Sequence, residues 1–233
     1  AKIVQEEVVG PTLGAQSIHQ GLVSFAIAFV LLMLYMILMY NFIPGMMANL
    51  ALLANLFFTL GVLASFQSAL TMPGIAGIVL TLGMAVDANV LINERIKEEL
   101  RKGKMMTQAI KDGYGNAFSA IFDSNLTTII TGVVLFYFGT GPIRGFATTW
   151  IIGLVISFFT AVFLTRIIFE NRVGKDKWLN LTFTTGISKN FMQNKSHHFL
   201  SMYKTTFAIW GIAVLVCIGS FVVRGLSRSI DFT

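Results

Sequence analysis

The sequence predicts an all-α membrane protein that crosses the bilayer six times. Hydrophobic residues make up 55% of the 233 residues and charged residues 12%, and the mean hydropathy is +0.74. A soluble domain of this length would be left with apolar faces that it could not cover. Six runs carry almost no charge, and each is long enough for the roughly 20-residue helix that spans a bilayer. A polytopic helix bundle is therefore expected.

The expected spans are separated by gaps of different character. The gaps 40–45, 67–74 and 139–145 are short and rich in Gly or Pro, which is typical of tight turns between neighbouring helices. The first span is too long for a signal peptide and follows Glu6 and Glu7, so the chain is expected to be an interior piece of a longer polypeptide. The spans are expected at 21–39, 46–66, 75–92, 117–138, 146–165 and 205–223.

Lysine and arginine are distributed unequally between the two sides of the membrane. The gaps 93–116 and 166–204 hold thirteen of the seventeen basic residues. The positive-inside rule assigns these gaps to the cytoplasm, so both ends of the chain are expected on the periplasmic side. The remaining four basic residues all fall on that outer side: Lys2, Arg144, Arg224 and Arg228.

The gap 93–116 is patterned as an amphipathic helical elbow at the cytoplasmic surface. Ile96 and Leu100 recur at helical spacing, Gly103 is expected to end the helix, and Thr107 is expected to cap a second short helix. A solvated face and a topology signal explain its charge most simply, and a direct binding role is the alternative.

Other chemistries have little support in the sequence. The basic residues form no patch interleaved with aromatics, so no nucleic-acid partner is expected. His197 and His198 are adjacent without a Cys or acidic partner at ligand spacing, so no metal site is expected. The chain has no GxxxxGK[ST], HExxH or GxSxG motif, and an energy source other than ATP and a role other than covalent catalysis are expected.

Asp87 is the residue that most needs an explanation. It lies in GMAVDANVLINERI, residues 83–96, within an otherwise apolar span. An ionised aspartate at the bilayer centre costs at least about 2.5–3.5 kcal/mol, so such residues usually face a bundle interior or a water path. A proton carrier is the functional interpretation. Hydrogen-bonded contact between helices is the structural alternative.

Asp123 is expected at a similar depth to Asp87. Asp87 is thirteen residues from Gly74, about 20 Å of helical rise, and Asp123 is fifteen from Phe138, about 22 Å. A polar stripe runs along the helix of Asp123 and is expected to face protein, although hydration or helix capping would also explain this acid. The stripe consists of Asn116, Ser119, Asp123, Thr127 and Thr131. The expected hydrogen-bonding partners of the two acids are Asn89, Asn125, Thr127 and Thr128. Polar contact between helices is the alternative role for these four residues.

Two long runs carry a resemblance to a known family. GIAGIVLTLGMAVDANVLINERIKEELRKGK and AFSAIFDSNLTTIITGVVLFYFGTGPIRGFATTW closely resemble the membrane half of the SecD family, within a match over 8–166. The part from about 191 to RSIDFT is similar to the beginning of SecF, in the order found in fused SecDF proteins. Asn93 and Ser124 depart mildly from the family pattern.

The resemblance implies an RND-type fold and a domain order. The five-helix SecD-like bundle would occupy 19–168 with the elbow at 93–116, followed by a cytoplasmic linker at 169–201 and the first SecF-like helix at 202–223. Residues 1–18 and 224–233 would be the ends of two periplasmic domains, and within them AKIVQEEVVG (1–10) and SRSIDFT (227–233) have strand-like character.

The resemblance also implies a role. Family members help the SecYEG channel to draw preproteins across the bacterial inner membrane, using protons or sodium instead of ATP. Asp87 matches the family's proton-relay candidate, and Asp123 matches its D-x-N-L-T-T motif. The implied partners are SecYEG, a YajC-like accessory subunit, the moving preprotein and lipid, with no cofactor other than the coupling ion. The alternatives are an RND exporter of small molecules or lipids, and a passive scaffold of the translocon.

Overall fold

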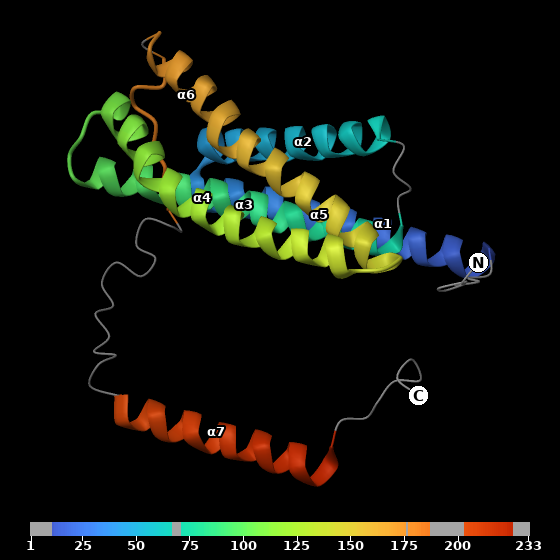
Figure 1. Cartoon of the computed structure of the whole chain (residues 1–233). Helices are drawn as coiled ribbons and strands as arrows, with labels where there is room; N and C mark the ends of the chain where they lie inside the picture. The colour runs from blue at the N-terminus through green and yellow to red at the C-terminus, as the bar shows by residue number, and fades with distance from the viewer. Residues whose placement is uncertain (1–10, 67–70, 176, 187–202, 226–233) are drawn as a thin grey trace. The chain divides into compact units, whose positions relative to one another are not determined.

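The structure is a computed structural model that describes residues 11–66, 71–175, 177–186 and 203–225. The strand-like segments expected at 1–10 and 227–233 lie outside the described residues, as do His197 and His198. All the regular elements among the described residues are helices (Figure 1). They are α1 (Pro11–Tyr40), α2 (Phe42–Ser65), α3 (Met72–Arg101), α4 (Met106–Phe138), α5 (Pro142–Phe158), the π-helix η1 (Phe159–Leu164), α6 (Thr165–Val173) and α7 (Tyr203–Arg224).

The expectation of an all-α chain with six spans is confirmed. Six helical stretches among the described residues are long and apolar enough to cross a membrane, because α5, η1 and α6 form one continuous stretch from Pro142 to Val173. The chain divides into two compact units, residues 1–191 and 192–233. Helix α7 belongs to the second unit, and nearly all its described side chains are exposed.

Local sequence signals determine where the helices begin. Asn41 separates α1 from α2 with a positive φ of 71°, and its side chain accepts a hydrogen bond from the backbone N–H of Phe42. The hydroxyl of Thr71 caps α3 by accepting from the Gly74 N–H, just before a proline at the start of the helix. Gly141, with a φ of +46°, allows the turn into α5.

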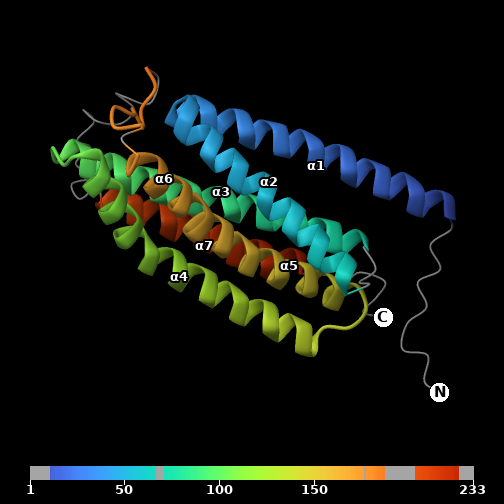
Figure 2. The same ribbon diagram turned by 90° about the horizontal axis from the view of Figure 1, so that it is seen from above.

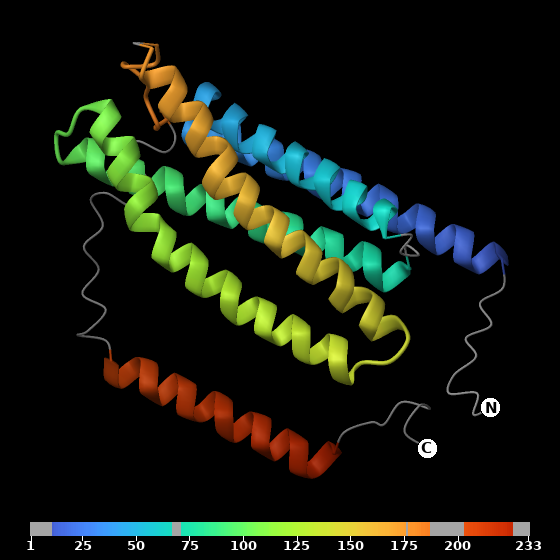
Figure 3. The same cartoon turned by 45° about the horizontal axis from the view of Figure 1, so that its top comes forward.

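Helix α3 is the central helix of the first unit. It packs against α1, α2, α4 and α5, and 56% of its most apolar stretch is buried. The corresponding fraction of α4 is only 11%, so α4 is an edge helix. Helices α1 and α4 lie on opposite sides of the unit (Figures 2 and 3).

Small residues bring α3 and α5 into their closest contact. A Cβ atom added to Gly153 of α5 would lie 2.7 Å from Oγ1 of Thr81 on α3. A Cβ atom added to Gly77 of α3 would collide with Thr149 and lie 3.0 Å from the carbonyl oxygen of Phe146. This pattern of small residues is the usual way in which membrane helices approach each other.

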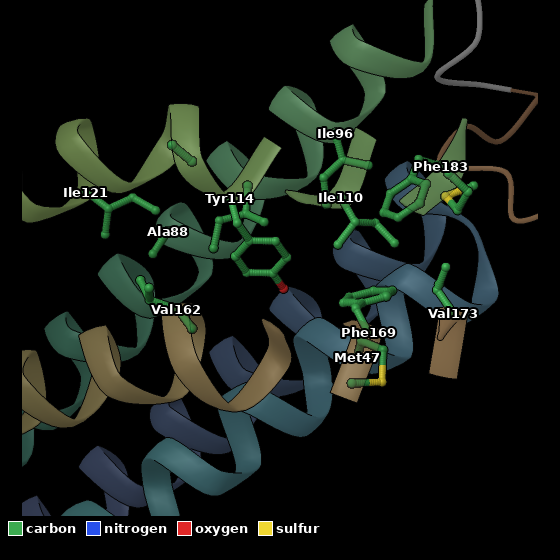
Figure 4. Packing of buried hydrophobic residues seen from close by; sticks show 14 residues of the cluster. Met47, Ala88, Ile96, Ile110, Tyr114, Ile121, Val162, Phe169, Val173 and Phe183 are labelled. Atoms are coloured by element: carbon green, nitrogen blue, oxygen red, sulfur yellow. The ribbon is translucent and has the colours of Figure 1, made fainter. Parts of the chain in front are cut away.

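An apolar core fills the inner end of the unit, which carries the basic gaps. Residues from α2, α3, α4, η1 and α6 meet there, with Ile96 and Ile110 fully enclosed (Figure 4). The hydroxyl groups of Tyr114 and Thr165 form a hydrogen bond of 2.7 Å at the border of this core. The core therefore joins the elbow to the two helices that follow it.

The elbow at 93–116 differs from the expectation in one respect. Helix α3 ends at Arg101, and Gly103 adopts a φ of +83°, as the sequence indicates. The prediction of a separate short helix capped by Thr107 is wrong: α4 starts at Met106, with Met105 as N-cap, and runs unbroken to Phe138. Apolar contacts across the elbow, rather than a cap, hold this start in place.

An ion-pair network closes the elbow turn. Glu99 is only 3% exposed, and Oε1 accepts from Nζ of Lys102 at 2.8 Å and from Nδ2 of Asn116 at 3.3 Å. Lys104 bridges the other oxygen of Glu99 and the carboxylate of Asp112, the latter at 2.6 Å. The hydrogen bond to Asp112, with that to Glu99, raises the pKa of the Lys104 ammonium.

The segment after α6 returns to the inner corner between α1 and α2. We call residues 177–186 the return segment. Phe183 is 1% exposed and packs on Phe169 within the inner core. Thr185 donates a hydrogen bond of 2.6 Å to the carbonyl oxygen of Leu38, and Nδ2 of Asn41 donates to the hydroxyl of Thr182. The expected linker 169–201 thus begins as part of the packed unit.

Candidate functional site

Asp87 borders a small cavity between α3 and α4. The cavity has a volume of about 60 Å³, which is room for at least one water molecule. Leu91 follows Asp87 on the wall formed by α3, and Ser124, Asn125 and Thr128 supply polar atoms from α4. The remaining lining residues are Met84, Ala88, Ala120 and Ile121. A carboxylate, two hydroxyl groups and an amide therefore meet around a space that can hold water.

The two acids lie at nearly the same level, but only Asp87 lines the cavity. The residues of α4 that face Asp87 lie between Ala120 and Thr128, a range that includes Asp123. Asp123 itself is exposed, next to the lining residue Ser124. The structure thus agrees with the similar depth derived from helical rise and separates the directions of the two side chains.

Three of the expected supporting residues lie on α4 and bond to their own helix. Nδ2 of Asn125 donates to the carbonyl oxygen of Ile121 at 2.7 Å, and Thr128 donates to that of Ser124 at 2.8 Å. Thr127 is exposed, bonds to the backbone of Asp123 at 3.1 Å, and does not line the cavity. Asn125 and Thr128 therefore accompany Asp87 at the cavity, whereas Thr127 accompanies Asp123.

Asn89 lies apart from Asp87. Its side chain is 5% exposed, and Nδ2 donates to the carbonyl oxygen of Ala85 at 2.9 Å. Two residues along an α-helix correspond to a rotation of about 200°, so Asp87 and Asn89 point to different sides of α3. The structure therefore does not bring Asn89 to the cavity.

The polar stripe of α4 faces outward from the described unit. Its members Asn116, Ser119, Asp123, Thr127 and Thr131 are exposed, as is Asp87 on the neighbouring helix. Among the described residues of the first unit, the expectation that this stripe faces protein is met only by Asn116, which donates to Glu99 of α3. The other members lie on the outer side of the edge helix α4. One side of the Asp87 side chain thus borders the cavity, and the other side is exposed.

Sequence reasoning did not select Ser124 as a site residue. It noted Ser124 only as a departure from the family pattern, yet this residue lines the cavity beside Asp87. Ser124 could have been predicted from helical rise. Asp87 and Asp123 are expected at similar depths, so the residues next to Asp123 on α4 are expected opposite Asp87.

The family of the chain follows from comparisons with known proteins. Residues 1–173 match the family described as "Protein export membrane protein SecD/SecF, C-terminal". Proteins named "Protein translocase subunit SecD" are similar to this chain, with 57% identity over 166 residues in Magnetococcus marinus and 55% over 168 residues in Desulfurispirillum indicum. These matches cover 71% and 72% of this chain but only 31% and 32% of the relatives. The chain thus spans about a third of their length.

A solved structure of SecDF gives the same arrangement of helices. The translocon-associated membrane protein SecDF from Thermus is 34% identical, with a TM-score of 0.86 over 96% of this chain and 30% of its own. A second SecDF structure, in a form titled "Super-membrane-facing", gives a TM-score of 0.81 at the same identity. The sequence match, the six spans and the shared fold agree, and the chain belongs to the SecD/SecF family of protein export membrane proteins.

Proposed function

We propose that this chain is the membrane part of a protein-export subunit that is driven by an ion gradient, with Asp87 as the carrier of the proton. The observation that carries the proposal is a carboxylate in an apolar helix long enough to span a bilayer, beside a cavity of about 60 Å³ that is lined in part by polar residues. An acid in that place is expensive unless it borders water, and water is also what a proton needs to reach it. Sodium is the alternative coupling ion, since the carboxylate and hydroxyl oxygens are hard ligands.

The similar proteins are named as translocase subunits, which supports protein export as the process that the ion gradient drives. On this proposal the chain sits in the bacterial inner membrane with both ends in the periplasm. Its partners are the SecYEG channel, a YajC-like subunit and a preprotein in transit. Moving one charge through the membrane field yields about 2.3 kcal/mol per 100 mV, which is enough to bias a conformational equilibrium.

Replacing Asp87 by asparagine in the full-length protein tests the proposal. Asp87→Asn keeps the shape of the protonated acid and removes its exchange. It is expected to assemble with its partners normally and to lose the stimulation of export by a proton gradient in inverted membrane vesicles. Gly83→Ala is the matched control, because Gly83 lies one turn outward on the same face and has nothing within 4 Å of an added Cβ.

The same measurement separates the alternatives. Export in Asp87→Asn that is still stimulated by the gradient would overturn the proposal. Normal export with altered tolerance to drugs or lipids would instead indicate an RND exporter of small molecules. Indifference to Asp87, together with sensitivity to the packing residue Gly77, would indicate a passive scaffold.

A further inference from the structure

A second carboxylate lies on the Asp87 side of α3, closer to the inner surface. Glu94 follows Asp87 by seven residues, which corresponds to two helical turns, about 10.5 Å of rise and a rotation of only about 20°. The first basic residue of the inner gap, Arg95, comes directly after it. Glu94 therefore stands where the membrane-spanning part of α3 meets the inner surface.

The Glu94 carboxylate has two enclosed polar neighbours. Nζ of Lys97, on the next turn of α3, lies 3.1 Å from Oε1 of Glu94. The hydroxyl of Tyr40, at the end of α1, lies close to the same carboxylate. Lys97 is 6% exposed and Tyr40 is 1% exposed. An ion pair within α3 thus holds this carboxylate, with a hydroxyl of α1 nearby.

Glu94 is nevertheless open to the inner side, because 43% of its side chain is exposed. Between it and Asp87 lies Leu91, a half-buried apolar residue that forms the inner wall of the cavity. The order along α3 is therefore a carboxylate at a cavity, an apolar side chain, and a fixed carboxylate in contact with solvent. That order is the one expected at the inner end of a proton path, with two carboxylates as proton-binding groups and an apolar side chain as the barrier between them.

Few other ionisable groups face Glu94. Helix α2 and η1 contain none, and α5 contains only Arg144, at its outer end. On α3 itself, Arg95 pairs with Glu98 at 2.9 Å. On the neighbouring α4 and α6, Asp112 pairs with Lys104, Arg166 pairs with Glu170, and Arg172 lies over the Trp178 ring. The other charged residues of α4 are Lys111 and Asp123, and neither is paired with Glu94. Lys97 and Tyr40 are thus the ionisable contacts that the described residues give Glu94.

We propose that Glu94 is the inner proton port of the relay, the group that passes protons between Asp87 and the cytoplasm, with Leu91 as the barrier between the two acids. The inference rests on the proposed function of Asp87. In each cycle the proton leaves the Asp87 carboxyl, crosses by way of water when Leu91 moves aside, and binds the Glu94 carboxylate. It then passes to solvent, so that both acids end as carboxylates and no other group changes.

The test is Glu94→Gln in the full-length protein, measured as gradient-driven export in inverted membrane vesicles. The expected rate is about a hundredfold lower, at the low end of what a positioned proton-transfer group contributes. Glu98→Gln is the matched control and is expected to retain the rate, since Glu98 lies one turn further on and is 47% exposed within ion pairs. Small weak acids added on the cytoplasmic side are expected to restore export in Glu94→Gln, because they can carry protons in place of the carboxylate.

The outcomes distinguish this inference from the function on which it rests. Export that stays gradient-driven in Asp87→Asn would overturn the proposed function. Loss of export in Asp87→Asn with a normal rate in Glu94→Gln would overturn the inner port alone. A slow Glu94→Gln that weak acids do not restore would also overturn it, because that result indicates a structural role.

A folding defect would not obscure the answer. Glu94→Gln leaves the enclosed Lys97 ammonium without its carboxylate, and breaking such a pair is strongly destabilising. The double variant Glu94→Gln with Lys97→Met removes the charge that is left behind. It is expected to fold, to export slowly and to respond to weak acids in the same way. Failure of that rescue in the stable double variant contradicts the proposal.

Discussion

Asp87 shows how a single carboxylate can be tolerated at membrane depth. Its side chain has a cavity lined in part by polar residues on one side and an open face on the other, so it escapes the full cost of burial in hydrocarbon. Asn89, two residues further on, is enclosed and satisfied by its own helix. Asp87 and Asn89 therefore lie in different environments, although they belong to the same motif.

Ser124 supplies a prediction at the residue scale. Ser124→Val replaces a hydroxyl in the cavity wall by two methyl groups, which fill the space and remove a partner for water. Gradient-driven export is expected to fall several-fold, with normal protein levels. Ser119→Val is the control, because Ser119 is exposed on α4 and does not line the cavity. Equal rates in the two variants would show that the cavity is not part of the path.

The sequence singles out the candidate residue Asp87, but it does not predict which residues lie next to it. The expense of a charge in an apolar span points to Asp87, and helical rise places Asp123 at the same level. Which way each side chain points depends on the rotation of α4 against α3. That rotation is fixed by apolar contacts such as Ile121 on the inner core, and no local pattern encodes it.

At the scale of elements, the contact between α3 and α5 depends on glycine. Gly77→Ala places a methyl group against Thr149 and 3.0 Å from the carbonyl oxygen of Phe146, so the helices have to separate. A loss of about 1–3 kcal/mol in unfolding free energy is expected, as for other overpacked contacts. Thermal unfolding in detergent measures it.

The control for this prediction lies on the same helix. Gly83→Ala adds a methyl group into open space, and its unfolding temperature is expected to equal or exceed that of the unchanged protein. A drop of equal size in both variants would contradict the role of the α5 contact, because alanine favours the helix at both positions.

The elbow shows which features of an element a sequence encodes. Gly103 ends α3 because its left-handed conformation favours glycine, and this signal is local. The start of α4 has no such signal: Thr107 is a suitable cap by type but lies within the first helical turn. Apolar contacts of Met106 and Ile110 with the inner core settle that boundary, and contacts between distant residues are not visible in a local motif.

At the scale of the molecule, the charge distribution predicts which ends of the helices face the cytoplasm. In a Cys217→Ser background, Thr140→Cys in the turn before α5 and Met105→Cys in the elbow turn provide one exposed thiol each. A maleimide that cannot cross membranes is expected to label Thr140→Cys from the periplasmic side and Met105→Cys only in inverted vesicles. The reverse pattern would overturn the topology and place the Glu94 port on the wrong side.

The return segment has a consequence for the biosynthesis of the chain. The corner between α1 and α2 forms hydrogen bonds with partners that lie 141 and 147 residues later in the sequence: Asn41 donates to Thr182, and Leu38 accepts from Thr185. The ribosome thus has to complete five spans before this early corner obtains its last bonds. Until then the Nδ2 group of Asn41 and the carbonyl oxygen of Leu38 lack these two partners.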